Sequence, residues 1–336
     1  MRILVTGGAG YVGSVSVEAL VAGGHDVVVL DDLSKGHRDS LPADVRLVVG
    51  SYGDPSVVRP LLAETPVDAV LHCAARSLVG ESVANPALYY RENVGGGVAF
   101  LEALREAGVR RFVFSSTAAV YGTPEVVPVT EDAPLRPINP YGETKRTVEA
   151  ALCWYGAAYE LRSVSLRYFN VAGASPLNGE VHEPETHLVP NVLRAVETGL
   201  PVTIFGSDYP TPDGTCIRDY IDVEDLARAH LLALEATAPD DPRTSGPAGS
   251  GAALVLNLGN GGGFSVRQVV AAVEAVTGRP VPVTLGGRRA GDPPVLVADA
   301  SRARQVLGWE PARPDIRDIV ATAWAWRRQN HGGYRA

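Results

Sequence analysis

Cysteine is scarce in this chain, which has only Cys73, Cys153 and Cys216 among its 336 residues. Their number is odd and no two of them form a CxxC pair, so the sequence favours neither a disulfide framework nor a zinc site. Scattered free thiols are typical of a reducing compartment, and we therefore expect a cytoplasmic protein that holds no metal.

Long apolar runs and blocks of basic charge are also missing. No stretch approaches the roughly 20 apolar residues that cross a bilayer. Because residues 1–5 already have the pattern of a strand, we expect no signal peptide. The formal net charge is −8, with charges of both signs interspersed, so the sequence argues against a membrane and against nucleic acid as partners.

Lysine is nearly absent as well, because 28 of the 30 basic residues are arginine and only Lys35 and Lys145 remain. A GC-rich genome that encodes arginine for any generic cation explains this bias. Each remaining lysine is then a weak indication of a site at which the broad guanidinium would not serve.

What the chain has is a regular alternation of short Val/Ile/Leu-rich runs with helical patterns. Near-continuous apolar strands separated by helices indicate a parallel sheet covered on both faces. We therefore predict an α/β fold with a doubly wound parallel sheet of the Rossmann type. The expected strands are Arg2–Thr6, Asp26–Leu30, Val45–Val49, Ala69–His72, Arg111–Ser116 and Ser163–Arg167, and the expected helices are Tyr11–Ala22, Val57–Glu64, Asn93–Ala107 and Tyr141–Tyr159.

The pattern loosens after the sixth strand, where loops rich in Pro, Gly and Asn separate shorter elements. Such loops are typical of a binding lobe. We expect residues 1–173 to form a cofactor domain, with a returning segment near 216–236, and residues 174–336 to form a smaller mixed α/β substrate lobe. Residues 243–253 have the composition of a flexible surface loop, and a terminal helix is expected at 316–329.

A glycine loop follows the first strand, with Gly7, Gly10 and Gly13 at the spacing G-x-x-G-x-x-G. Glycine permits a tight turn and the close approach of a pyrophosphate, to which the next helix offers free N–H groups. Asp31 lies 18 residues after Gly13, where a carboxylate can bind the adenosine ribose and repel a 2′-phosphate. The sequence therefore predicts NAD; a solvated loop pair, Asp31-Asp32, is the plainer alternative.

A second motif, Tyr141-Gly142-Glu143-Thr144-Lys145, places Tyr141 and Lys145 one turn apart on one helix face. A free tyrosine has a pKa of about 10 and is a poor base at neutral pH. A nearby ammonium would stabilise the phenolate and lower that pKa, so we predict that this pair carries the chemistry. Thr117 follows the strand Arg111–Ser116, and we expect its hydroxyl to share the reacting proton, the alternative being a plain strand-end cap.

Together these residues resemble the extended short-chain dehydrogenase/reductase superfamily and, within it, the UDP-glucose 4-epimerase family. The resemblance runs from end to end of the chain. It is carried by VTGGAGYVGS (5–14), DDLSKG (31–36), VGESV (79–83), NPYGETK (139–145), LRYFNVAGA (166–174), FGSDYPTPDGTCIRDYIDVEDLA (205–227), NLGNGGGFSV (257–266) and RRAGDPP (288–294). The stretch 205–227 is the longest and most specific of these.

The resemblance implies interconversion of UDP-glucose and UDP-galactose through a closed redox cycle. Tyr141 would take the proton of the sugar 4-hydroxyl while C4 gives a hydride to NAD. The 4-keto ring would then turn about its pyrophosphate tether and receive the hydride on its other face. Thr117 would orient the hydroxyl and Lys145 would lower the pKa of Tyr141. A homodimer joined through a four-helix bundle, formed by the helices near 93–107 and 141–159, is also implied.

The resemblance also assigns binding residues. For NAD they are Gly7, Gly10, Tyr11, Val12, Gly13, Asp31, Asp32, Ser51, Tyr52, Cys73, Ala74, Ala75, Asn93, Tyr141, Lys145 and Tyr168. For the UDP-sugar they are Thr117, Tyr141, Asn170, His187, Leu188, Phe205 by the uracil, Arg218 and Arg289 at the diphosphate, and Asp292 at the uridine ribose. Arginine forks suit phosphates, although an isolated arginine is more often part of a surface ion pair.

Several positions depart from the family pattern. Ser51-Tyr52 stand where relatives commonly have an acidic residue near the adenine, and Arg76 is shifted by one from the usual basic residue. Asp222 stands where many members have histidine. Leu296 occupies the position whose size gates N-acetylated sugars, so UDP-GlcNAc and UDP-glucuronate remain open as alternative substrates.

Two further readings compete with the epimerase. A sugar-nucleotide dehydratase or decarboxylase places an acidic residue after the position of Thr117, where this chain has Ala118 and Ala119. A non-catalytic NAD-sensing protein would be expected to have lost Tyr141 or Lys145, and the chain retains both.

Overall fold

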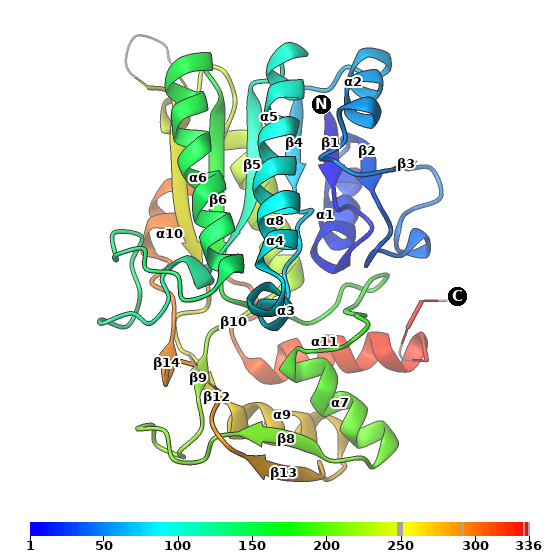
Figure 1. The fold of residues 1–336 in the computed structure, drawn as a ribbon. Helices are drawn as coiled ribbons and strands as arrows, with labels where there is room; N and C mark the ends of the chain where they lie inside the picture. Colours follow the sequence, from blue (N-terminus) through cyan, green and yellow to red (C-terminus); the bar gives the residue numbers. More distant parts are fainter. Residues whose placement is uncertain (247–250, 290–291, 332, 335–336) are drawn as a thin grey trace.

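Seven strands form the central sheet of the computed structural model, which describes residues 1–246, 251–289, 292–331 and 333–334. All neighbouring strands of this sheet are parallel, which confirms the predicted doubly wound α/β fold (Figure 1). Across the sheet the order is β11 (Ala253–Leu258), β6 (Arg162–Tyr168), β5 (Arg111–Thr117), β4 (Ala69–His72), β1 (Arg2–Thr6), β2 (Asp26–Asp31) and β3 (Arg46–Val49).

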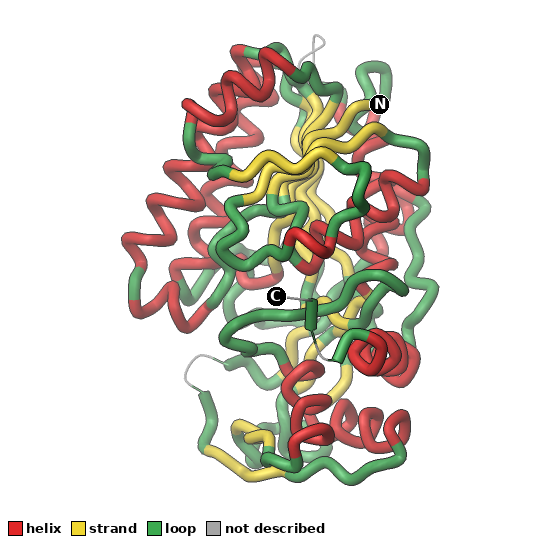
Figure 2. The backbone as a smooth tube through the Cα atoms, turned by 90° about the vertical axis from the view of Figure 1, so that its right-hand side faces the viewer, coloured by secondary structure: helices red, strands yellow, loops and turns green. Residues whose placement is uncertain are grey.

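Helices cover both faces of this sheet, and Figure 2 shows the strands between them. Side chains alternate along each strand, so Ile3 and Val5 pack toward one group of helices and Leu4 toward the other. The first group is α1 (Tyr11–Ala22), α8 (Val223–Ala236) and α10 (Ser301–Leu307); the second is α2 (Pro55–Glu64), α5 (Gly96–Glu106) and α6 (Pro140–Tyr159). Burial on both faces explains why the strands read as continuous apolar runs.

The segment between β4 and α5 differs from the single helix that the sequence predicts at 93–107. The chain forms α3 (Val79–Ala84), α4 (Pro86–Tyr89) and the π-helix η2 (Tyr90–Gly95) before regular α-helix begins at Gly96. The buried Asn93 side chain bonds to the backbone of Arg76 and to Thr144, so tertiary contacts set the conformation of this stretch. π-Helical turns of this kind are frequent beside functional sites.

The second lobe packs three helices around a small core. The helices are α7 (Leu188–Thr198), α9 (Val266–Thr277) and α11 (Ile316–Gln329), and the strand groups are β8 (Val202–Phe205) with β13 (Val283–Gly286), β12 (Phe264–Ser265) with β9 (Ile217–Arg218) and β14 (Val295–Leu296), and β7 (Asn170–Ala172) with β10 (Tyr220–Asp222). Val192, Val269 and Ile319, one from each helix, are fully buried together. This lobe lies beyond the carboxyl ends of the strands of the large sheet (Figure 1).

The chain returns to the large sheet after entering the second lobe. Within the segment 216–236, α8 packs against α1 through Val223 and Ala227, which meet Tyr11 and Val15. A further return follows, because β11 pairs with β6 and α10 covers it, and the sequence reading did not foresee this strand. The surface loop expected at 243–253 overlaps the one-turn helix η4 (Pro242–Thr244) and the start of β11, and its residues 247–250 lie outside the described residues.

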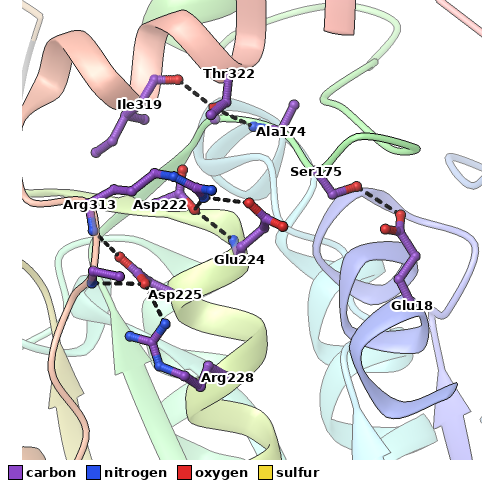
Figure 3. Close-up of polar contacts among 12 residues, drawn as sticks. Glu18, Ala174, Ser175, Asp222, Glu224, Asp225, Arg228, Arg313, Ile319 and Thr322 are labelled. Carbon is purple, nitrogen blue, oxygen red and sulfur yellow. Dashed lines mark hydrogen bonds and ion pairs between the residues drawn. The ribbon is translucent and has the colours of Figure 1, made fainter. Parts of the chain in front are cut away.

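Polar contacts join the two lobes beside α8 (Figure 3). The carboxylate of Asp225 accepts hydrogen bonds from the backbone N–H groups of Ala312 at 3.0 Å and Arg313 at 2.9 Å. The Arg313 guanidinium lies 3.1 Å from Asp222, and Ser175 donates to Glu18 of α1 at 2.8 Å. Because these groups are largely withdrawn from water, they fix where the second lobe sits over the strand ends.

None of the described helices is both long enough and apolar enough to span a bilayer.

Candidate active site

The glycine loop forms a cradle at the end of β1. A side chain at Gly7, whose φ is 70°, would collide with the backbone of Ala74, and one at Gly13 would collide with the Gly7 carbonyl. Those two glycines are required by packing inside the protein. A Cβ at Gly10 would meet only the Gly7 carbonyl oxygen, at 3.4 Å, so open space lies in front of this residue.

The N-terminus of α1 opens into this cradle. Gly10 is its N-cap, and no side chain caps the helix. The N–H groups of the first turn, which includes the predicted contacts Tyr11 and Val12, therefore point with the positive end of the helix dipole toward the open side of Gly10. A pyrophosphate fits such a site.

Asp31 holds the cradle in place. Its carboxylate is buried and accepts hydrogen bonds from the N–H groups of Ala9 at 2.9 Å and Leu33 at 2.8 Å. Burial raises the pKa of this carboxyl, while the two N–H donors lower it. A carboxylate can accept about four hydrogen bonds, so Asp31 retains capacity for ribose hydroxyls. The neighbouring Asp32 is exposed, and its carboxylate lies 4.0 Å from the guanidinium of Arg76.

The other residues expected near the adenosine use their side chains mainly to shape the protein. Ser51 accepts a hydrogen bond from Gly53 N–H at 3.1 Å, and Tyr52 donates to the Glu92 carbonyl at 2.8 Å. Both N–H groups of the Asn93 amide are used, on the Arg76 carbonyl and on Thr144. Any contact of Asn93 with a ligand is therefore left to its oxygen, which also accepts from Arg76 N–H.

The catalytic candidates meet where β5 ends and α6 begins. The Asn139 side chain caps α6 by accepting from Gly142 N–H at 2.9 Å. A side chain at Gly142 would collide with the Ala119 carbonyl, so this glycine lets α6 approach the end of β5. The close approach brings Tyr141 near enough to the Thr117 side chain for that hydroxyl to lower the pKa of Tyr141. Thr117 Oγ1 also accepts a hydrogen bond from Ala119 N–H at 3.1 Å and so caps the turn that follows β5.

Lys145 lies one turn further along α6 and is only 3% exposed. Its ammonium donates to the Ser115 carbonyl at 2.7 Å and stands over the Phe114 ring at 4.6 Å from the centroid. The Ser115 hydroxyl in turn contacts the Cys73 sulfur at 3.4 Å. The ends of β4 and β5 and the start of α6 thus meet at one point, where Thr117 also lies opposite Tyr168 of β6.

The pKa of Tyr141 is shifted in the opposite direction from the one expected, since the sequence predicts a lowered pKa for this tyrosine. Burial raises the pKa of Tyr141 to about 12, and the hydrogen bond with Thr117 only partly offsets it. Burial also lowers the pKa of the Lys145 ammonium to about 8, opposed by Cys73 and Glu149. Desolvation penalises both charged forms, so Tyr141 needs additional positive charge beside it to serve as a base near neutral pH.

A buried ion pair beneath these residues escaped the sequence reading. Glu149, one further turn along α6 from Lys145, pairs with Arg167 of β6 at 2.5 Å, and the two side chains are 6% and 5% exposed. Ser116 donates to Glu149 at 2.5 Å, and Arg167 donates to the Tyr121 hydroxyl at 2.9 Å. The spacing Tyr-x-x-x-Lys-x-x-x-Glu was the available signal, since it places three polar side chains on one helix face.

The residues predicted for the uridine diphosphate gather in the second lobe. The Arg289 guanidinium lies over the Phe205 ring at 4.0 Å from its centroid, and Arg218 reaches Asp292 at 3.2 Å. Phe205 is 37% exposed and Arg289 is exposed. Ala290-Gly291, in the middle of the motif 288–294, lie outside the described residues.

The remaining substrate candidates lie on β7 and at the start of α7. Asn170 is on β7, where its N–H donates to the Asp219 carbonyl at 3.0 Å. His187 is the N-cap of α7 and Leu188 its first residue. The His187 imidazole contacts Glu180 at 2.7 Å, so its ring is committed to the protein. Leu296 packs with Val120 and Tyr121 near the end of β5.

A comparison with family models matches residues 3–245 to the family described as "NAD dependent epimerase/dehydratase family". A relative from Corynebacterium glutamicum, named UDP-glucose 4-epimerase, is 50% identical over 327 residues, which cover 97% of this chain and 95% of the relative.

Solved structures show the same likeness. UDP-glucose 4-epimerase from Brucella ovis in complex with NAD superposes with a TM-score of 0.91 at 43% identity, covering 99% of this chain and 98% of that one. The enzyme of the same name from Bifidobacterium longum, in complex with NAD+ and UDP, gives a TM-score of 0.91 at 34% identity, covering 99% and 100%. The agreement extends over both lobes.

Proposed function

Because the chain belongs to the NAD dependent epimerase/dehydratase family, we propose that it is a UDP-glucose 4-epimerase that interconverts UDP-glucose and UDP-galactose. The observation that carries the proposal is the meeting of Tyr141, Thr117 and Lys145 beside an open glycine cradle. Relatives that carry this name match the chain over almost its whole length, both lobes included.

The cradle fits NAD. The open side of Gly10, the uncapped first turn of α1 and the carboxylate of Asp31 suit the pyrophosphate and the adenosine ribose. Ser51, Tyr52, Asn93 and the stretch Cys73-Ala74-Ala75 would line the remainder. When bound, NAD supplies the hydride acceptor and the hydride donor for C4 of the sugar.

Within the protein, Tyr141 moves the proton. Its phenolate oxygen takes the proton from the 4-hydroxyl and later returns one to the 4-oxygen, so no net proton or redox change remains. Thr117, whose side chain lies beside Tyr141, orients the hydroxyl. Bound NAD would bring the positive charge that a buried phenol with a pKa of about 12 requires, and the Lys145 ammonium, held at Ser115, would add to it.

The second lobe holds the nucleotide end of the substrate. Arg218 and Arg289 offer guanidinium forks to the diphosphate, Phe205 offers a ring face to the uracil, and Asp292 offers a carboxylate to the ribose. Asn170 and the loop at His187-Leu188 would contact the sugar side of the cleft. Each of these assignments is part of the proposal.

Ala118 and Ala119 favour epimerisation over water or CO2 loss. These two residues follow Thr117, and Ala118 is buried at the start of the one-turn helix η3 (Ala118–Val120). No acid stands there to eliminate a leaving group. Leu296 packs beside Val120 and Tyr121, and UDP-GlcNAc and UDP-glucuronate are the alternative substrates of the same reaction.

One assay tests this function. The purified protein is incubated without added NAD with UDP-glucose, UDP-galactose, UDP-GlcNAc or UDP-glucuronate, and the products are separated and weighed by mass spectrometry. We expect UDP-glucose and UDP-galactose to interconvert at unchanged mass and faster than the other pairs. Loss of water or CO2, or turnover that requires stoichiometric NAD, would refute the closed cycle.

A cytoplasmic homodimer completes the proposal. Cys73, Cys153 and Cys216 are free thiols, which suits a reducing compartment. On the outer face of α5 and α6, Val98 is 42% exposed and Trp154 is 75% exposed, an apolar surface suited to a four-helix bundle with a second copy. Sedimentation of Trp154→Glu, compared with the native protein, tests the interface: we expect a shift toward monomer.

A further inference from the structure

The eight residues between Gly179 and Leu188 include two histidines and three glutamates, and both histidines lie in close contact with two of the glutamates. The cluster 180–187 consists of Glu180, His182, Glu185 and His187, and one donor atom from each lies within 4.8 Å of all the others. The side chains of Glu180 and Glu185 are 6% and 9% exposed. The imidazoles of His182 and His187 are 23% and 46% exposed, so the two carboxylates face inward and the imidazoles line the side that is open to water.

The distances within the cluster suit one small metal ion. Nδ1 of His187 lies 2.7 Å from Glu180 Oε1 and 3.3 Å from Glu185 Oε1. Nδ1 of His182 lies 3.4 Å from Glu180 Oε1 and 3.8 Å from Glu185 Oε2. Zinc bonds of about 2.0–2.2 Å in a tetrahedron place neighbouring donor atoms about 3.4 Å apart. Small shifts therefore suffice for all four donors to surround one ion.

His182 supplies an independent observation. Its Nδ1 is buried, yet it makes no hydrogen bond within the described part of the chain. Buried polar atoms are nearly always paired. The groups nearest this nitrogen are the carboxylates of Glu180 and Glu185, at 3.4 and 3.8 Å, which offer no proton to its lone pair in the neutral imidazole. A metal ion would use that lone pair. The sequence argument against zinc considered only cysteine, and it does not apply to imidazole and carboxylate donors.

The cluster lies against the cofactor cradle. The His182 ring meets the Tyr11 ring edge-on, with centroids 6.4 Å apart, and Lys35 donates to the Glu183 carbonyl. At its other end the cluster runs into α7, because Glu185 Oε1 accepts from the N–H of His187 at 2.9 Å. An ion held here would fix the segment that connects the glycine loop with the start of α7.

We propose that Glu180, His182, Glu185 and His187 bind one divalent transition-metal ion of the zinc class. Mixed imidazole and carboxylate donors favour Zn2+ over Mg2+ and Ca2+, which take oxygen ligands. Four protein ligands complete a tetrahedral shell and leave no position for substrate, so the role of the ion is structural. This site does not depend on the proposed reaction.

Zinc chloride is the probe for the test. Untagged protein with its cofactor is stripped of metal with a chelator, titrated calorimetrically with Zn2+, and analysed for bound zinc. We expect one zinc ion per chain, no displacement by equal Mg2+, and a higher melting temperature with zinc. His182→Gln and Glu180→Gln should each weaken binding at least tenfold. His25→Gln, the same change at a histidine outside the cluster, should leave binding unchanged.

Two results would overturn the metal site. The first is that the native protein binds no stoichiometric zinc. This holds even if His182→Gln lowers the stability, because the cluster would then be an ion-pair network. The other is His182→Gln and Glu180→Gln binding zinc as tightly as the native protein. If His182→Gln does not fold, Glu180→Gln provides the same comparison, since it keeps the size of the side chain and removes its charge.

Discussion

The two ends of the proposed site are built in different ways. At the chemical end, Thr117 and Lys145 are 9% and 3% exposed, and both lie on or directly after regular elements of the first lobe. At the nucleotide end, Phe205 is 37% exposed and Arg289 lies in a loop of the second lobe. The reacting groups are thus buried on long elements of the packed first lobe, whereas the recognition groups lie at the ends of short strands and in loops of the second lobe.

This difference matches the different demands of proton transfer and of substrate recognition. Proton transfer requires atoms placed to within a few tenths of an ångström, which elements buried on both sides can provide. Recognition of a flexible diphosphate tolerates more movement, which the ends of short strands and loops allow. We therefore expect changes at the chemical end to lower kcat and changes at the nucleotide end to raise KM.

The largest effect is expected from Tyr141→Phe. The variant keeps the ring and loses only the hydroxyl that moves the proton, so kcat should fall by about 10³-fold or more while KM changes little. A coupled assay of UDP-galactose conversion measures both constants. Tyr159→Phe, the same change at a half-exposed tyrosine near the end of α6, should behave as the native enzyme. Undiminished turnover by Tyr141→Phe would show that Tyr141 is not the catalytic base.

Lys145→Met should lower kcat at pH 7 by roughly 10²-fold and also change its pH dependence. Tyr141 accepts a proton only as phenolate, and its pKa of about 12 lies above the assay range. In the native enzyme kcat should therefore rise with pH up to about pH 8, where the Lys145 ammonium, whose pKa is lowered to about 8, begins to lose its proton. Loss of the ammonium raises the phenol pKa further, which moves this rise to higher pH. If the variant kept the pH–rate profile of the native enzyme, Lys145 would not influence the ionisation of Tyr141.

Glu149→Gln tests the support beneath the chemical end. It leaves the Arg167 guanidinium buried without its carboxylate, which should lower the free energy of unfolding by about 3 kcal/mol. Urea denaturation measures the change. Glu106→Gln, at the exposed pair with Arg59, is the matched control and should leave the midpoint unchanged. Equal effects of the two substitutions would show that burial of the pair is unimportant.

The smallest effect is expected at the nucleotide end. Arg218→Ala removes a guanidinium proposed to bind the diphosphate, so KM for UDP-galactose should rise by roughly 10- to 30-fold and kcat should change less than twofold. Arg279→Ala removes an exposed arginine of the same lobe and serves as control. A fall in kcat with unchanged KM would contradict the division between the two ends.

Much of the first lobe follows from its sequence. The helix predicted at Tyr11–Ala22 and the strand at Ala69–His72 have those bounds in the structure. Local patterns suffice there because each strand is buried on both faces and each helix has one apolar face. The sequence predicts ordinary helix from Asn93 and so misses the π-helix at Tyr90–Gly95, because this form depends on contacts of Asn93 with residues far away in sequence.

In the candidate site, too, some contacts follow from local sequence spacing and others depend on the tertiary structure. Tyr141 and Lys145 are four residues apart, so a helix brings them together without further information. The role of Glu149 as a buried ion-pair partner is evident only once the position of Arg167 is known. The cluster 180–187 has no spacing typical of a metal site, and only the folded loop turns His182 and His187 toward the two glutamates.

The sequence by itself determined the sheet, the glycine cradle, the Tyr–Lys pair and the family, because these depend on short spacings and local periodicity. The tertiary structure decided where β11 joins the sheet, which ion pair lies under the catalytic helix and how burial shifts the pKa of Tyr141. Burial and charge pairing depend on distances between segments remote in the chain, and no local pattern contains those distances.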